Sequence, residues 1–232
     1  GPVEVTEQSW PKCAQCGLTP AEKACRAEGK KSPLFCPMEL EEAVIERARQ
    51  SYQEPVNLEF ARQASLQEAS CYLVDEANPD LRQPVKPRLQ EIAEFSQRMG
   101  YKRLGLAFCI GLRSEAAAVN QVLRAYGFEV VSVICKVGRI PKEEIGVADS
   151  EKINPGKLEV MCNPVAQAEI LNAASTDFNI ALGLCVGHDS LFFKYAQAPT
   201  TVLAVKDRVT GHNPLAAVYT LGSYYTKLLP KK

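Results

Sequence analysis

The sequence predicts an α/β fold with a mainly parallel, five-stranded sheet covered by helices, in a Rossmann-like or flavodoxin-like arrangement. Three observations support this. After Gly100, short apolar runs alternate with helical stretches, which is typical of parallel strands joined by crossover helices. Before Gly100 the apolar spacing is helical, and ahead of those helices lies a segment rich in cysteine and proline with few large apolar side chains.

The expected strands are residues 103–109, 128–135, 158–162, 178–185 and 200–205. Near-continuous apolar runs of this kind suit strands that are buried on both faces. The helices between them are expected at residues 114–126, 163–174 and 187–196, with Gly127 ending the first and Asn163 able to cap the second.

Three further helices are expected before the sheet, at residues 39–50, 58–75 and 88–99. Pro37 precedes the first and Gly100 ends the last, as helix termini favour. Cys71 falls on the packing face of the second and is expected to be a small buried hydrophobe. The predicted organisation is a cysteine-rich segment at 1–37, a helical segment at 38–100 and an α/β domain at 101–232.

The charge balance argues against nucleic acid and anionic membranes as partners, because 27 Lys and Arg residues offset 27 Asp and Glu residues. No run approaches the roughly 18 apolar residues that span a bilayer, and the N-terminus lacks the basic-then-apolar order of a signal peptide. We therefore expect a cytoplasmic protein whose partner is a small-molecule substrate or a redox partner protein. Cytosolic cysteines bind metal more often than they form disulfides.

Four of the nine cysteines crowd into the polar N-terminal segment, at Cys13, Cys16, Cys25 and Cys36. A Cys-x2-Cys turn lets two sulfurs face one ion, and thiolates suit zinc or an iron-sulfur cluster. Metal binding would order a segment that cannot form a core of its own. Zinc is the preferred metal, although the second half of the segment lacks the usual Cys-x2-Cys of a zinc ribbon. The pair Cys36-Pro37 resembles the one that closes some ferredoxin motifs, so a second iron-sulfur cluster stays open.

Four other cysteines each end an apolar run that is an expected strand: Cys109, Cys135, Cys162 and Cys185. Taken singly, each would be an ordinary buried core residue. Together they occupy the same topological position, and the carboxyl ends of parallel strands are where such sheets bind ligands. Since neighbouring strands lie about 4.8 Å apart, their loops could converge on a 4Fe-4S cluster more easily than on one zinc ion.

The chain's two histidines also fall at this predicted edge. His188 follows Cys185 after two residues, and His212 lies in the polar loop after the last strand, together with Lys206 and Arg208. Single histidines are often surface or satisfied core residues, but loops in this position carry chemistry. His188 and His212 are the proton-transfer candidates, and Lys206 and Arg208 are candidates to bind an anion.

The chain resembles the DUF1847 family of cysteine-rich proteins, found mainly in anaerobic bacteria and archaea. The resemblance rests on the four N-terminal cysteines, the turn Cys162-Asn163-Pro164, the string from Gly183 to Asp189, Lys206-Asp207-Arg208, and the string from Gly211 to Pro214. It implies a cysteine-bound metal and names no reaction.

Two functions follow from these observations. The first is an iron-sulfur protein of anaerobic metabolism. With four cysteine ligands its 4Fe-4S cluster would transfer electrons, and with three the free iron could act as a Lewis acid on a small substrate. The second is a non-catalytic zinc protein that uses only the N-terminal four-cysteine site, while the α/β domain binds a partner or small ligand. Whether the protein is an enzyme stays open at this point.

Overall fold

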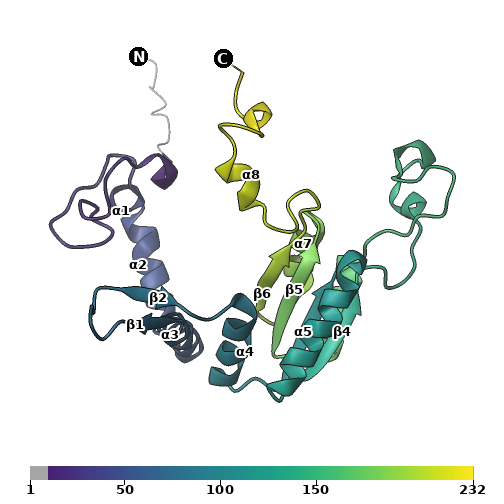
Figure 1. Ribbon diagram of the computed structural model, residues 1–232, viewed down its shortest axis with the longest axis horizontal. Helices are drawn as coiled ribbons and strands as arrows, with labels where there is room; N and C mark the ends of the chain where they lie inside the picture. Colours follow the sequence, from purple (N-terminus) through teal and green to yellow (C-terminus); the bar gives the residue numbers. More distant parts are fainter. Residues whose placement is uncertain (1–9, 232) are drawn as a thin grey trace, which may run out of the picture. The chain divides into compact units, whose positions relative to one another are not determined.

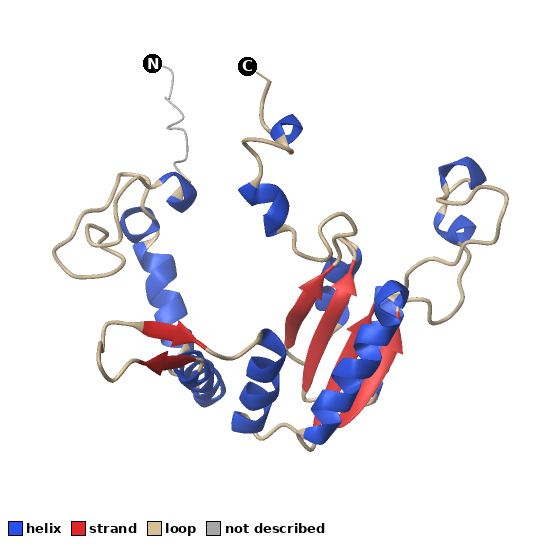
Figure 2. Ribbon diagram, viewed as in Figure 1, coloured by secondary structure: helices blue, strands red, loops and turns tan. Residues whose placement is uncertain are grey.

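The computed structural model describes residues 10–231, and these divide between two compact units, Gly1–Leu66 and Gln67–Lys232. The second unit contains a parallel sheet (Figure 2). Its strands are β3 (Arg103–Phe108), β4 (Glu129–Ile134), β5 (Phe178–Leu184) and β6 (Thr200–Val205), in the order β4-β3-β5-β6. All three pairings are parallel, which confirms the predicted α/β class.

Renumbered along the chain, the strand order is 2-1-3-4, the order that flavodoxin-like sheets share. The chain leaves β3 toward one edge to form β4 and then returns past it to form β5, so the order reverses between β3 and β5. Ligands of such sheets bind beyond the carboxyl ends of the strands at this reversal. The topology therefore predicts a ligand site beyond the carboxyl ends of β3 and β5.

Three helices connect the strands: α5 (Arg113–Ala125), α6 (Pro164–Ala173) and α7 (His188–Tyr195). Right-handed crossovers put α5 on one face of the sheet, and α6 and α7, which contact each other, on the other face (Figure 1). The core between α6, α7 and the sheet is small and aliphatic apart from Phe192, with Ala107, Val133, Ala168, Leu171, Ala181 and Leu184 around it.

The predicted fifth strand at 158–162 is wrong. This segment only forms an isolated antiparallel bridge between Val160 and Pro141, outside the sheet. The reason lies in Glu159, whose carboxylate accepts hydrogen bonds from the Lys142 ammonium and from the backbone N–H groups of Ile153 and Asn154. These local bonds fold the segment back on residues before it, so it belongs to an insertion between β4 and α6.

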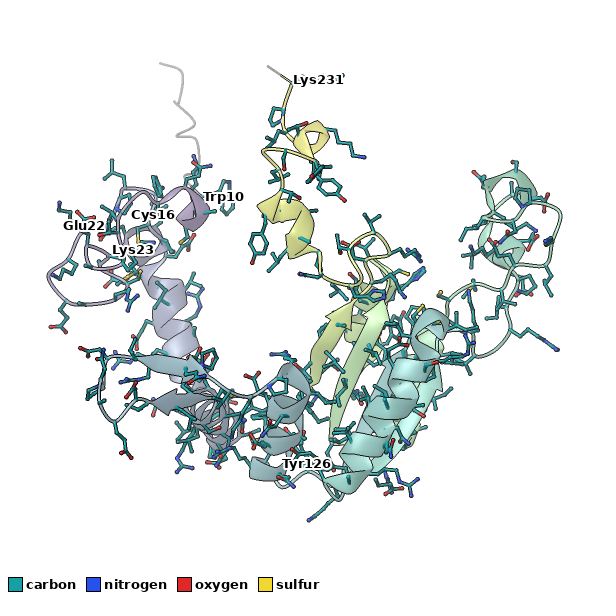
Figure 3. All side chains as sticks on the ribbon, viewed as in Figure 1. Trp10, Cys16, Glu22, Lys23, Tyr126 and Lys231 are labelled. Atoms are coloured by element: carbon teal, nitrogen blue, oxygen red, sulfur yellow. The ribbon has the colours of Figure 1, made fainter. Side chains whose placement is uncertain are left out.

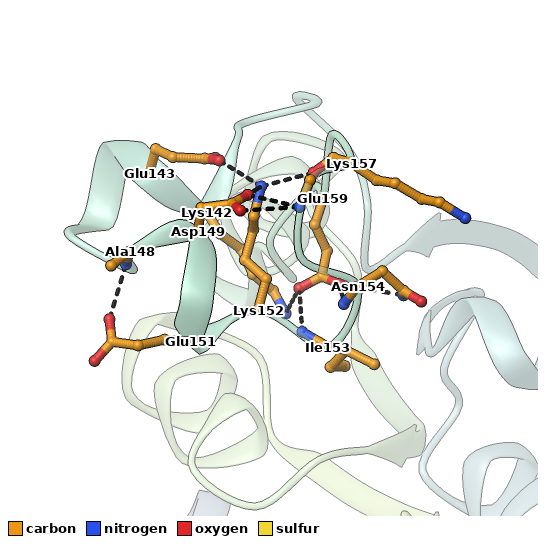
Figure 4. A network of polar contacts seen from close by, with 11 residues as sticks. Lys142, Glu143, Ala148, Asp149, Glu151, Lys152, Ile153, Asn154, Lys157 and Glu159 are labelled. Atoms are coloured by element: carbon orange, nitrogen blue, oxygen red, sulfur yellow. Dashed lines mark hydrogen bonds and ion pairs between the residues drawn. The ribbon is translucent and has the colours of Figure 1, made fainter.

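This insertion, residues 138–162, is held by polar contacts rather than by apolar packing (Figure 4). It contains two short 3-10 helices, η3 (Lys142–Ile145) and η4 (Asp149–Glu151). The side chain of Lys152 is 3% exposed, and its ammonium contacts the carboxylates of Glu143 and Asp149, each at 2.7 Å. A buried lysine tolerates this position because both carboxylates and a backbone carbonyl surround it.

The predicted helix at 58–75 is too long. The helix α3 (Pro55–Ser70) ends before Cys71, and the next residues pair as a hairpin of β1 (Tyr72–Val74) and β2 (Arg82–Pro84). An aromatic and a β-branched residue in this short run favour a strand, and the turn at 78–80 closes it. Cys71 itself is buried, as expected.

The helix α4 (Arg88–Arg98) matches the predicted 88–99, and Gly100 adopts a left-handed conformation after it. Phe95 of this helix packs against Tyr101 and Phe178, which joins α4 to the start of β5. After β6 come the short helices α8 (Leu215–Tyr219) and η5 (Thr226–Leu228). Among the described helices, none is long and apolar enough to cross a membrane.

The first unit has no buried residue between positions 10 and 66. Its helices are η1 (Cys13–Gln15), α1 (Pro37–Leu40), α2 (Glu42–Ser51) and the greater part of α3. The loops are tied by backbone bonds, such as that from the Lys12 N–H to the Phe35 carbonyl, over 3.3 Å. Hydrophobic burial therefore contributes little to the order of this cysteine-rich region.

Candidate metal centre

The structure brings the four cysteines of the α/β domain together at the carboxyl edge of the sheet. They line one small cavity with His188, Gln167 and Leu184. Cys109 follows β3, Cys135 follows β4 and Cys185 follows β5. Since β3 and β5 flank the reversal of strand order, the cavity lies where this fold binds ligands.

Cys162 reaches the cavity by a different route from the predicted strand end. The Asn163 N–H donates to the Cys135 carbonyl over 2.7 Å, and the Met161 N–H donates to the Ile140 carbonyl over 2.8 Å. These two bonds hold the residues on either side of Cys162. The Asn163 side chain then caps α6 by accepting from the Ala166 N–H, as expected from the sequence.

Cys135 is the central thiol of the group, within hydrogen-bonding reach of both Cys109 and Cys162. These two contacts and burial raise the pKa of Cys135. The pKa of Cys109 is lowered to about 5, chiefly by the Cys135 hydrogen bond, with help from the Gly111 N–H and the Lys206 ammonium.

The pKa of Cys162 is shifted in the same direction as the pKa of Cys109. The hydrogen bond with Cys135 lowers its pKa to about 5, and the charges of Lys136 and His188 add to the effect. Two of the three contacting sulfurs are thus in surroundings that favour the thiolate.

The sulfurs of Cys109, Cys162 and Cys185 each have a cationic side chain nearby. Lys136 Nζ lies 3.7 Å from the Cys162 sulfur, and Arg208 Nη2 donates to the Cys185 sulfur over 3.2 Å. Lys206 approaches Cys109 across Gly111, where an added Cβ would lie 3.4 Å from its Nζ. The ion pairs of the described residues include none of these three cations.

Two buried polar atoms of the cavity residues have no hydrogen-bond partner among residues 10–231: Gln167 Oε1 and His188 Nδ1. Gln167 is fully buried, and its Nε2 donates to the carbonyls of Phe108 and Val133. Gln167 was not predicted from the sequence. Its helical spacing, three residues after Pro164 and four before Leu171, could have indicated a polar side chain on the buried face of α6.

The second histidine has a structural role. His212 adopts a left-handed conformation and closes a turn, since its Nδ1 accepts from the Asp207 N–H over 3.1 Å and its own N–H donates to the Asp207 carbonyl. Asp207 also accepts from the backbone of Val209 and Thr210, which lowers its pKa. This turn orients the loop that carries Lys206 and Arg208. His212 is not among the residues that line the cavity.

The N-terminal cysteines form a second group, within the first unit. Cys13, Cys16, Cys25 and Cys36 line one cavity of about 90 Å³. The Cys16 N–H donates to the Cys13 carbonyl, which closes the Cys-x2-Cys turn. Cys16 and Lys23 lie in the same loop-rich region (Figure 3). Within residues 10–231, however, no three His, Cys, Asp or Glu side chains are arranged to hold a single metal ion at either group.

Comparison with known proteins places the chain in a family. The family described as "Protein of unknown function (DUF1847)" matches residues 36–203. The chain belongs to the DUF1847 family. It is also 44% identical to an uncharacterised protein of Methanocaldococcus jannaschii over 218 residues, which cover 94% of this chain and 97% of that protein. No solved structure matches it. The DUF1847 match spans the second cysteine group and, of the first, only Cys36.

Proposed function

We propose that this protein is an iron-sulfur protein with a 4Fe-4S cluster at the carboxyl edge of its sheet. The observation that carries the proposal is the convergence of Cys109, Cys135, Cys162 and Cys185, from four separate segments, on one cavity. Thiolates are the usual ligands of such clusters. A structural role for the cysteines as core hydrophobes would not require four of them at the reversal of strand order.

Within the described residues no three His, Cys, Asp or Glu side chains are arranged around a single ion at this edge. The proposal of a cluster therefore rests on the convergence of the four cysteines and on the charges around them, not on the spacing of their sulfurs.

The charges around the cavity also favour an anionic sulfur site. Lys136, Lys206 and Arg208 approach three different sulfurs without a carboxylate partner. Neutral thiols would give these cations no compensating charge, whereas a thiolate-bound cluster carries net negative charge. When bound, the cluster would accept and return one electron, and the three cations would stabilise the reduced form.

The same site allows Lewis-acid chemistry if one iron lacks a protein ligand. In that case Lys206 and Arg208 would hold an anionic substrate at the rim and His188 would transfer the proton. Electron transfer to a partner protein is the simpler function, since it needs only the cluster and a path to the surface. We further propose a cytoplasmic, anaerobic setting, where such clusters survive.

We assign a second metal site to Cys13, Cys16, Cys25 and Cys36. The support is the shared cavity and the lack of any buried residue between positions 10 and 66. A region without a core gains its folding free energy from the metal. The Cys-x2-Cys turn is typical of zinc, and a second iron-sulfur cluster is the alternative.

Anaerobic purification followed by iron, sulfide and zinc analysis tests both assignments. We expect a brown protein with about four irons at the sheet edge. Cys135→Ser should lose this iron while the N-terminal metal stays. Cys71→Ser is the matched control, because Cys71 is also buried but does not line the cavity, so the iron content of this variant should be unchanged. A colourless protein with one zinc would instead establish the non-catalytic zinc protein.

A further inference from the structure

The geometry points to His188, through its Nδ1 atom, as the fourth protein ligand of the cluster, with Cys109, Cys135 and Cys162 as the other three and Cys185 outside the ligand set. This inference rests on the proposed function. It favours electron transfer over Lewis-acid chemistry, because a cluster with four protein ligands has no iron left open for a substrate.

The first observation is the buried, unpartnered Nδ1 of His188. This atom has no hydrogen-bond partner among the described residues, and His188 lines the cavity with the cysteines. A buried polar atom without a partner is destabilising. Cys162 lines the same cavity as His188. A metal bound by the cysteines would give Nδ1 its partner.

The backbone fixes this placement. Gly187 has a φ of +85°, which lets the chain turn sharply between Cys185 and α7. His188 is the first residue of α7, and the next helical residue, Asp189, caps the helix by accepting from the Gly187 and Ser190 N–H groups. A carboxylate already accepts from backbone N–H groups at the N-terminus of α7, and His188 lines the cavity.

Gln167 Oε1 is the other unpartnered atom of the cavity, and it is the weaker candidate. Its amide is held in place by two carbonyls, which accept from Nε2. An amide oxygen suits Mg²⁺ or Ca²⁺, whereas imidazole suits iron. The chemistry of the donor atoms therefore favours His188.

Cys185 differs from the other three cysteines in its surroundings. Its sulfur accepts a hydrogen bond from the Arg208 guanidinium over 3.2 Å, whereas Lys136 Nζ lies 3.7 Å from the Cys162 sulfur. Cys162 and Cys185 are both half-buried, and Cys109 and Cys135 are buried. Cys135 contacts Cys109 and Cys162, and among the described residues Cys185 does not take part in these thiol contacts. Three sulfurs and one imidazole thus form the inner set, and the Cys185–Arg208 pair lies at its rim.

A neutral imidazole in place of one thiolate removes a negative charge from the cluster. Less negative charge favours the reduced state, so histidine ligation raises the reduction potential, as it does in clusters where histidines replace cysteines. The closed ligand set favours one-electron exchange with a redox partner protein over substrate binding at an open iron.

The test uses the full chain, purified anaerobically and reduced with dithionite. Pulsed EPR should detect coupling of the cluster to a histidine nitrogen, identified by labelling with ¹⁵N-histidine. Cys185→Ser should keep both the iron content and this coupling. His188→Cys should keep the cluster, lose the coupling and lower the reduction potential, because a thiolate replaces the imidazole.

His212→Ala is the matched control, since His212 is the chain's other histidine and does not line the cavity; its coupling should equal that of the unmodified protein. Loss of the cluster in Cys185→Ser, with His188→Ala still loaded, would overturn the inference, as would a loaded cluster without histidine coupling. An unmodified protein that binds no iron would overturn the proposed function as well, so the two failures are distinguishable.

Discussion

The backbone N–H of Asn163 donates to the carbonyl of Cys135 over 2.7 Å, and this bond sets Cys162 beside Cys135. The bond brings Cys162 to the edge of the sheet, where a fifth strand at residues 158–162 was expected to place it. A loop that returns from the insertion is thereby fixed to the end of β4, and its sulfur joins those of the strand ends.

Asn163→Ala should destabilise the protein by about 1 kcal/mol, because the side chain both caps α6 and donates to the Val137 carbonyl. Urea denaturation of the metal-free protein measures this change. Asn163→Asp keeps the capping acceptor and should recover most of the loss. Equal stability of the alanine variant and the original chain would show that the cap contributes nothing.

Lys206→Met should lower the reduction potential of the cluster, because the ammonium near Cys109 stabilises the added electron. For a cation near the surface the expected effect is on the order of 0.5–1 kcal/mol per electron. A redox titration followed by EPR measures it. Lys194→Met, on the exposed side of α7, is the control and should leave the potential unchanged.

Gly183→Ala should destabilise the domain more than an ordinary alanine substitution. Gly183 has a φ of +71° within β5, at a register shift, and an added Cβ would collide with Leu112. Left-handed strain and overpacking together predict a loss of about 2–4 kcal/mol. Thermal unfolding compares it with Gly222→Ala, where nothing lies within 4 Å. A similar melting temperature for the two variants would contradict this account of β5.

Removing the metal proposed at the N-terminal cysteines should unfold residues 10–66 and leave the α/β domain folded. No residue of this range is buried, so a bound metal would be its main source of order. A chelator strong enough to strip zinc should make the loops around Cys25 sensitive to protease, while fragments from residue 67 onward survive. Cys16→Ser should show the same sensitivity without chelator. Full protection in both cases would mean that another interaction orders this unit.

The insertion should loosen in acid. Hydrogen bonds from the Lys142 ammonium and from the Ile153 and Asn154 N–H groups lower the pKa of Glu159 from 4.5 to about 2. A depressed pKa stabilises the folded state above pH 4.5, and this stabilisation is lost as the pH falls from 4.5 toward 2. Hydrogen exchange in residues 138–162, corrected for intrinsic rates, should rise over that window. Glu159→Gln should exchange faster at neutral pH and lose the part of the pH dependence that Glu159 contributes. The part due to Glu143 and Asp149, whose pKa values are lowered chiefly by hydrogen bonds from Lys152, should remain.

Local patterns in the sequence were enough to predict most elements of the α/β domain. Gly100 and Gly127 end α4 and α5 as expected, because only glycine adopts the left-handed conformation there without strain. The errors fell where tertiary contacts override short patterns. Val160 is β-branched and lies in an apolar run, but the bonds of Glu159 keep it out of the sheet. Tyr72 continued a helical pattern, but pairing with Pro84 made it a strand residue.

The sequence by itself determined the class of the fold, the family and the grouping of the cysteines, because these depend on periodicity and on residue type. Only the tertiary structure decided which side chains meet. Gln167 and Arg208 come to the cysteines from α6 and from the loop after β6, at positions that no local pattern connects to Cys135 or Cys185. The physical reason is the order of the strands. The strands are all parallel, and their order reverses between β3 and β5, which brings distant segments to one edge. That order is set by packing of the whole sheet.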